Sequence, residues 1–278
     1  QIISGVAAFA GGPFYCAQGT ILYAETKCMA GTLGGPDVDT LVGLTYSDAK
    51  FNFIDDPSNL KNDKVFVYAG LSDTVVNPLV VHSLQAYYSY FMDAGRIVTS
   101  YNINSEHCLP TLDYGEDCTV LSSPYLGKCQ YDGAGAALQT MYGTLQPRTV
   151  ADPSRLYRFD QKPYIGQKYS SIGEVGFIYV PKACEDGAEC TLHISFHGCH
   201  MGVTELDDTY PQHAGFNEWA ESNNIIVLYP TVEVSEMMPY NPNGCWDWWG
   251  YTDKINYGVK KGVQPTFVRS LIKALTGK

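Results

Sequence analysis

Apolar and polar residues alternate clearly between residues 191 and 196, where Leu192, Ile194 and Phe196 are separated by polar residues. This period of two predicts a β-strand. The pattern stops at His197-Gly198-Cys199, where glycine allows a sharp turn and lets backbone amides face outward. A strand that ends in His-Gly and a loop is how many α/β-hydrolases form part of an oxyanion hole, but on this stretch alone a buried strand followed by any glycine turn is the better explanation.

Similar apolar runs predict further strands, and apolar residues at helical spacing predict helices. The strands fall at residues 2–9, 65–69, 96–102, 173–180, 192–196 and 225–229, and the helices at 77–94, 131–143, 215–223 and 263–275. Because strands and helices alternate, we expect an α/β fold with a mostly parallel sheet and helices on both faces.

Residues 146–167 interrupt this alternation, because they are polar and contain Pro147, Pro153 and Pro163. The segment is either a domain boundary or a long surface connection. The length of 278 residues suits one large domain or two small ones. No repeat or low-complexity linker occurs, and we expect a single domain over residues 1–278.

The chain carries 29 acidic and 18 basic residues, a formal net charge of −11. Such a chain repels polyanions, which argues against nucleic acid and anionic membrane surfaces as partners. No run of about 18 apolar residues is present, so no membrane span is expected. Neutral substrates or surfaces fit this composition better.

Nine cysteines are present, and several lie in local pairs. No CxxC spacing occurs, which argues against a zinc ribbon, whereas loop-spaced cysteines are typical of disulfides in secreted proteins. We pair Cys16 with Cys28, Cys118 with Cys129, Cys184 with Cys190 and Cys199 with Cys245, although spacing alone does not fix the connectivity. Cys108 is left over, either free or used between chains.

Two residues of catalytic type follow successive predicted strands. Asp73 comes after the strand at 65–69, and His107 comes after the strand at 96–102. Catalytic residues of open parallel sheets lie at the carboxyl ends of strands, and α/β-hydrolases present the acid and then the histidine of a triad in this order. Each residue alone would pass as an ordinary loop residue, but together they favour catalysis.

Five motifs, in the same order over essentially the whole chain, are similar to those of secreted, single-domain poly(3-hydroxybutyrate) depolymerases. They are Ala10-Gly-Gly-Pro-Phe-Tyr-Cys16, Gly70-Leu-Ser-Asp-Thr-Val75, Cys129-Gln-Tyr-Asp-Gly-Ala-Gly-Ala136, Leu192-His-Ile-Ser-Phe-His-Gly-Cys199 and Asn241-Pro-Asn-Gly-Cys-Trp-Asp-Trp248. Members of this family are serine esterases with a circularly permuted α/β-hydrolase fold. The resemblance implies that fold here, with the permutation connection near residues 146–167.

The resemblance also implies roles for individual residues. Asp73 would be the triad acid, His107 the general base, and the backbone N–H of Cys199 an oxyanion donor. Trp248 would line the crevice that binds the polymer, with Trp246 nearby; for Trp246 and Trp249, simple core packing is an equally good explanation. The family's disulfides match the four pairs above, and no metal or organic cofactor is implied.

The nucleophile that the family uses is absent from these 278 residues. Its serine lies in a Gly-x-Ser-x-Gly elbow, on a strand that precedes the segment matching residues 2–13. Ser4 and Ser195 are expected inside strands, and Ser72 lacks the second glycine of the elbow. In the family that strand lies between those matching residues 192–196 and 2–9, so its loss would split the sheet.

Three explanations are open, in order of preference. A segment carrying the serine is missing from this sequence, or it remains bound as a separate N-terminal peptide with Cys108 as the candidate link, or the protein is an inactive relative that only binds. The first two predict a secreted serine-type ester hydrolase acting on poly(3-hydroxybutyrate) or a related short-chain polyester. The third predicts a binding or structural protein that uses the tryptophan loop.

Overall fold

The computed structural model describes residues 2–166 and 170–278. Within these ranges the chain divides into two compact units, each with its own apolar core. The first unit contains the chain up to Cys108, together with Cys118–Leu121 and Asp247–Lys278, and the second contains Leu109–Asp117 and Ser122–Trp246. A single catalytic domain over residues 1–278 stays a prediction.

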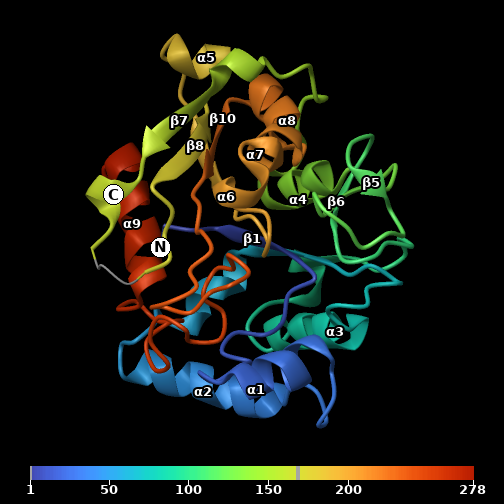
Figure 1. Cartoon of the computed structure of the whole chain (residues 1–278), viewed down its shortest axis with the longest axis vertical. Helices are drawn as coiled ribbons and strands as arrows, with labels where there is room; N and C mark the ends of the chain where they lie inside the picture. The colour runs from blue at the N-terminus through green and yellow to red at the C-terminus, as the bar shows by residue number, and fades with distance from the viewer. Residues whose placement is uncertain (1, 167–169) are drawn as a thin grey trace. The chain divides into compact units, whose positions relative to one another are not determined.

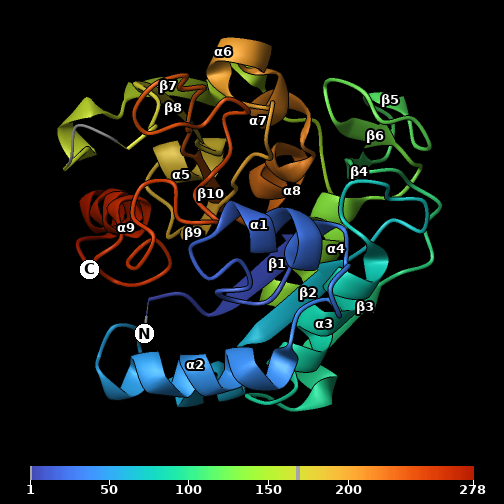
Figure 2. The same cartoon turned by 60° about the horizontal axis from the view of Figure 1, so that its bottom comes forward.

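The sheet of the first unit has three parallel strands in the order β1-β2-β3 (Figure 2). They are β1 (Gly5–Phe9), β2 (Lys64–Tyr68) and β3 (Ile97–Ser100). Phe9 lies opposite Tyr68, and Tyr68 lies opposite Ser100, so all three strands end at the same edge of the sheet. This register confirms the expected parallel arrangement.

The first unit also contains helices. The α-helices are α1 (Ile21–Tyr23), α2 (Val38–Lys50), α3 (Pro78–Tyr88) and α9 (Val263–Thr276), and helices of other types are η1 (Ala24–Met29), η2 (Pro57–Asn62) and η3 (Ala94–Arg96). The α3 helix packs on β2 and β3, and α2 packs on α3. The longest described α-helix, α9, has 14 residues, and no helix in the described ranges reaches the roughly 20 apolar residues that a bilayer requires.

The second unit contains a four-stranded sheet in the order β7-β8-β10-β9 (Figure 1). The strands are β7 (Leu156–Asp160), β8 (Val175–Tyr179), β9 (Thr191–Ile194) and β10 (Ile225–Tyr229). Strands β9 and β10 run parallel, whereas β8 pairs with both of its neighbours in antiparallel fashion. A second, small parallel sheet consists of β4 (Leu109–Thr111), β6 (Leu126–Lys128) and β5 (Glu116–Asp117).

Short helices complete the second unit. They are α4 (Gly133–Tyr142), α5 (Lys182–Glu185), α6 (Val203–Leu206), α7 (Thr209–His213) and α8 (Phe216–Asn223), with the turns η4 (Pro153–Arg155) and η5 (Lys162–Tyr164). The α8 helix packs on β10 and on α4. Phe177, Tyr179 and Tyr229 are almost fully buried in the core that these elements enclose.

The structure corrects the interpretation of residues 146–167 as a break in the fold. These residues contain strand β7, which lies at the edge of its sheet. Its prolines fall before and after the strand, where they leave the hydrogen-bonded ladder intact. Tyr157 and Arg158 are exposed, as an edge strand allows, and this hides the apolar pattern. Gln167, the end of the predicted break, lies outside the described residues.

Several element boundaries also differ from the prediction. Strand β1 begins at Gly5 rather than residue 2, and Ile2 and Ile3 are exposed. The predicted helix at 77–94 ends at Tyr88, and a separate short turn occupies Ala94–Arg96. The α2 helix was not predicted, because only Leu41, Val42 and Thr45 are buried along its 13 residues and the apolar stripe is narrow.

The cysteines pair as the sequence suggested. Disulfides join Cys16 to Cys28, Cys184 to Cys190 and Cys199 to Cys245. Cys118 and Cys129 are both disulfide-bonded, in agreement with the fourth proposed pair. Cys108 is a free, half-buried cysteine.

Buried histidines in the second unit make its stability depend on pH. His193 in β9 lies against the rings of Tyr142 and Phe216, and burial lowers its pKa to about 4. The histidine pKa in the unfolded chain is near 6.5, so between about pH 6.5 and pH 4 His193 is protonated in the unfolded chain but neutral in the folded chain. This stabilisation is complete above about pH 6.5 and is lost as the pH falls towards 4.

We therefore expect His193→Leu to reduce the loss of stability between pH 7 and pH 4.5 by about 2–3 kcal/mol, as measured by urea unfolding at both pH values. His82 is exposed, and His82→Leu serves as the matched control that should keep the full pH dependence. An unchanged pH dependence in the His193 variant would show that His193 titrates normally in the folded protein.

Candidate active site

A close backbone approach joins the ends of β2 and β3. The amide of Leu71 donates to the carbonyl of Ile103 at 2.9 Å, and that of Ser72 donates to the carbonyl of Ser105 at 3.1 Å. A Cβ atom on Gly70 would lie 2.3 Å from Oγ and 2.4 Å from the carbonyl oxygen of Ser105. Only glycine fits at this position, and the two turns that follow the strands are thereby held together.

Asp73 lies in the turn after β2, with a side chain that is only 2% exposed. One carboxylate oxygen, Oδ1, accepts hydrogen bonds from the amides of Val75 at 2.9 Å and Val76 at 2.8 Å. The other, Oδ2, lies 2.9 Å from Nδ1 of His107. The two backbone bonds fix the orientation of the carboxylate, so that Oδ2 faces the imidazole.

His107 follows β3 and is 34% exposed, so its ring is open to solvent on one side. Because Nδ1 is engaged by Asp73, the other ring nitrogen, Nε2, is the one placed to exchange a proton with a substrate or nucleophile. No hydrogen bond to Nε2 is present among the described residues. The arrangement is that of an acid orienting a general base.

Glu106 supports this pair, a role that the sequence analysis did not predict. Its Oε2 accepts hydrogen bonds from the amide of His107 at 2.9 Å and from the amide of Thr74 at 3.1 Å. The carboxylate of Glu106 thus links the backbone of Thr74, which follows Asp73, to the backbone of His107. No pattern in the sequence distinguishes it from an ordinary charged loop residue.

The loop after β9 belongs to the second unit and is held by His197, which is buried. Its Nδ1 donates to the carbonyl of Gly198 at 2.7 Å, and its Nε2 accepts from the amide of Val232 at 3.1 Å. Burial lowers the pKa of His197 to about 4, so the ring is neutral and fits this donor–acceptor pair. His197 therefore fixes the backbone immediately before Cys199.

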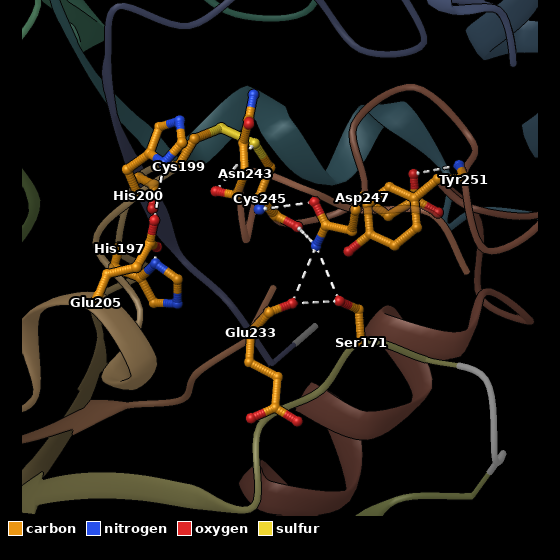
Figure 3. The surroundings of a disulfide bond; sticks show 12 residues. Ser171, His197, Cys199, His200, Glu205, Glu233, Asn243, Cys245, Asp247 and Tyr251 are labelled. Carbon is orange, nitrogen blue, oxygen red and sulfur yellow. Dashed lines mark hydrogen bonds and ion pairs between the residues drawn. A yellow bond between two sulfur atoms is a disulfide. The ribbon is translucent and has the colours of Figure 1, made fainter. Parts of the chain in front are cut away.

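Further bonds hold the other side of the Cys199 loop (Figure 3). Cys199 is joined to Cys245, and the amide of His200 donates to the carbonyl of Asn243 at 2.8 Å. The His200 ring lies 2.8 Å from Oε1 of Glu205. Asn241 is fully buried and bonds the backbone of Cys245 through both ends of its amide group, at 2.9 Å each. The loop is consequently rigid, as an oxyanion donor must be.

The predicted substrate-binding tryptophans fall in different units. Trp246 is in the second unit, where its ring lies 4.9 Å from that of Phe196 and 6.0 Å from that of His197. Its Nε1 is buried and has no hydrogen-bond partner within residues 2–166 and 170–278. Trp248 and Trp249 belong to the first unit and are half-buried against its core. The carboxylate of Asp247 shapes their loop by accepting from the amides of residues 250, 251 and 252.

None of the serines considered as substitutes has the features of a nucleophile. Ser195 is buried just after β9, and its hydroxyl lies 2.7 Å from that of Tyr210. Ser72 donates to Asn104 at 2.6 Å. The expectation that Ser4 lies within a strand is wrong, because β1 begins at Gly5; Ser4 is exposed. In the part of the chain that the structure describes, no serine hydroxyl is bonded to His107.

Cys108 is not a substitute nucleophile either, although it follows His107 directly. Burial, reinforced by the charges of Asp73 and Glu106, raises the pKa of its thiol to about 12. The thiolate is the reactive form of cysteine, and it is scarce at neutral pH when the pKa is so high. The same property makes Cys108 slow in disulfide exchange.

The structure thus brings Asp73 and His107 into contact in the first unit, and it places Cys199 and Trp246 within the second. A scan against known protein families gave no match. Two curated relatives cover nearly the whole chain. The poly(3-hydroxybutyrate) depolymerase of Delftia acidovorans is 39% identical over 272 residues, which are 96% of this chain and 53% of the relative. The polyhydroxybutyrate depolymerase of Talaromyces funiculosus is 34% identical over 290 residues, covering 98% of this chain and 83% of the relative.

The chain therefore spans about half the length of the Delftia enzyme and most of the Talaromyces enzyme. Solved structures of PHB depolymerases match the fold of this chain. A serine-to-alanine variant of a PHB depolymerase complexed with an R3HB trimer matches with a TM-score of 0.88 and 32% identity, over 97% of this chain and 86% of that one. The PHB depolymerase from Penicillium funiculosum matches with the same TM-score and coverage at 30% identity. The fold is thus that of an α/β-hydrolase, and the chain belongs to the poly(3-hydroxybutyrate) depolymerase family.

Proposed function

We propose that the working protein is an extracellular serine-type ester hydrolase that cleaves poly(3-hydroxybutyrate) or a related short-chain polyester. The observation that carries the proposal is the contact of the buried Asp73 carboxylate with Nδ1 of His107 at the ends of neighbouring parallel strands. The names of the relatives supply the substrate class. The disulfides and the net charge of −11 fit an extracellular protein that acts on a neutral substrate.

In this mechanism His107 removes the proton from a serine hydroxyl, which attacks the ester carbonyl. Asp73 holds the required tautomer and stabilises the imidazolium that forms. His107 then passes the proton to the leaving alcohol, and water releases the acyl group by the same route in reverse. The amide of Cys199, in its rigid loop, would donate to the developing oxyanion.

The nucleophilic serine is proposed to come from outside the 278 residues. Strand β1 is apolar but none of its five residues is fully buried, and in the described chain it pairs only with β2. Strand β9 likewise pairs only with β10. Parallel strands are normally buried and paired on both sides. An additional strand that carries the serine would satisfy the open edge of β1 and place a hydroxyl near the carboxyl end of the sheet, where His107 lies.

We expect Asp73→Asn and His107→Ala each to lower the rate of hydroxyacid release from a poly(3-hydroxybutyrate) film by about 10⁴-fold, because either change removes the oriented base. Circular dichroism should show an intact fold. His82→Ala, an exposed histidine of the same unit, is the matched control and should keep full activity. Hydrolysis that persists in a folded His107 variant would exclude the proposed triad.

Labelling with a fluorophosphonate probe tests the origin of the serine. We expect one adduct on the native, non-reduced protein, and peptide mapping should place it on a serine that is not among the 278 residues. The intact mass should exceed that of this chain. Absence of any adduct, together with film adsorption without hydroxyacid release, would instead identify a binding protein.

The tryptophan loop should affect polymer binding more than chemistry. We expect Trp248→Ala to weaken adsorption to the film and to raise the KM for a soluble hydroxybutyrate trimer several-fold, with a smaller change in kcat. Trp219→Phe, a change at a buried core tryptophan, controls for general loss of aromatic packing. Equal adsorption by the Trp248 variant and the native protein would assign Trp248 to the core alone.

A further inference from the structure

A polar cavity of about 280 Å³ lies within the second unit, and the proposed reaction does not use it. Its wall includes Tyr114, Asp132, Arg148, His213 and Glu218. These residues come from the loop after β4, the start of α4, the segment before η4, and the α7–α8 region. All of them belong to one compact unit, so the cavity is formed by that unit alone.

Glu218 is the unusual member of this wall. Its Oε2 is buried and has no hydrogen-bond partner among the residues that the structure describes, while Oε1 lies 3.5 Å from the guanidinium of Arg148. Burial raises the pKa of Glu218. A buried polar atom without a partner is unfavourable, so the needs of the fold alone do not account for a carboxyl group at this position.

Neighbouring groups are already satisfied or fixed in place. Asp132 accepts from the amide of Gly135 at 2.7 Å and from Nε1 of Trp219 at 2.9 Å, so its carboxylate is occupied. The amide of Thr149 donates to the carbonyl of Glu218 at 3.0 Å, which holds Arg148 beside α8. Arg148 lies 3.5 Å from both carboxylates, too far for short hydrogen bonds, and its N–H groups are open to a ligand.

Tyr114 and His213 supply a flat, rigid element of the wall. Their rings are stacked in parallel, with centroids 3.6 Å apart and an interplanar angle of 5°. Burial lowers the pKa of His213, which favours the neutral ring. The cavity wall therefore combines the carboxyl group of Glu218, the guanidinium of Arg148 and a stacked pair of aromatic rings.

From these groups we propose that the cavity is a binding site for a small neutral ligand with adjacent hydroxyl groups, such as a single sugar ring. One hydroxyl donates to the carboxylate of Glu218, and a hydroxyl oxygen accepts from Arg148. An anion would meet the carboxylates of Asp132 and Glu218, and a cation would meet Arg148, so a neutral donor–acceptor group fits best. The volume suits one ring and is below that of typical drug-sized pockets.

Saturation-transfer NMR and calorimetry with D-glucose, D-galactose, D-xylose and glycerol would test this site on the full protein. At least one sugar should bind, and its Kd should increase tenfold or more in both Glu218→Gln and Arg148→Met. Glu189, an exposed glutamate of the same unit, provides the control: Glu189→Gln should bind as the native protein does. Circular dichroism would establish that the variants are folded.

Two results would overturn the proposal. If no probe binds, or if binding survives both substitutions, the cavity holds only solvent. If 3-hydroxybutyrate or methylammonium binds in place of the sugars, the ligand is charged and the assignment to a neutral polyol is wrong. Because the site is tested by binding, its outcome is independent of the proposed ester hydrolysis.

Discussion

The contact between the turns after β2 and β3 is the constraint on which the candidate catalytic pair depends. Parallel pairing brings the ends of the two strands to one edge, but pairing alone would leave their turns free to diverge. The absence of a side chain at Gly70 lets the backbone of Ser105 approach, and two backbone hydrogen bonds then join the turns. Asp73 and His107 are 34 residues apart in sequence, yet their side chains come into contact because the two turns are held together at Gly70 and Ser105.

In the second unit, buried polar side chains hold the Cys199 loop in place. The Cys199 loop has no regular structure, so its backbone groups need partners from elsewhere. His197 supplies a donor and an acceptor on one side, and Asn241 does so on the other. Both are uncharged and buried, and a hydrogen bond is electrostatically stronger in the protein interior than in water. Rigidity here comes from satisfied polar groups together with the Cys199–Cys245 disulfide.

Sequence patterns predicted the parts of the fold that are apolar and periodic. The cores of β2, β8, β9 and β10 were found because each is a short apolar run between turn residues, and Asp73 and His107 were found because they follow such runs. Strand β7 and helix α2 were not predicted, because they lack a clear apolar pattern. Strand β7 lies at a sheet edge, and α2 buries few residues. Periodicity reports burial, and these elements are only partly buried.

Such patterns do not predict sites whose residues come from several distant segments of the chain. Glu106, His197 and Asn241 act through hydrogen bonds to backbone groups, and their partners are identified only by the folded chain. The cavity around Glu218 draws on four separate stretches, and of its lining residues only Asp132 falls within one of the five motifs. The resemblance to a known family could supply the catalytic roles, but it could not supply a feature that the family's motifs do not contain.

The open edges of β1 and β9 bear on how this fold is completed. An exposed edge strand offers unpaired N–H and C=O groups that recruit other strands, and natural proteins protect such edges with charge, proline or cover. Strand β1 lacks the first two protections, because its sequence, Gly-Val-Ala-Ala-Phe, is uncharged and free of proline. A strand of this composition is suited to an interior position, where both edges are paired. The same pairing that would complete the sheet would also bring a catalytic group to its carboxyl edge. A second neighbouring strand for β1 would therefore serve both stability and activity.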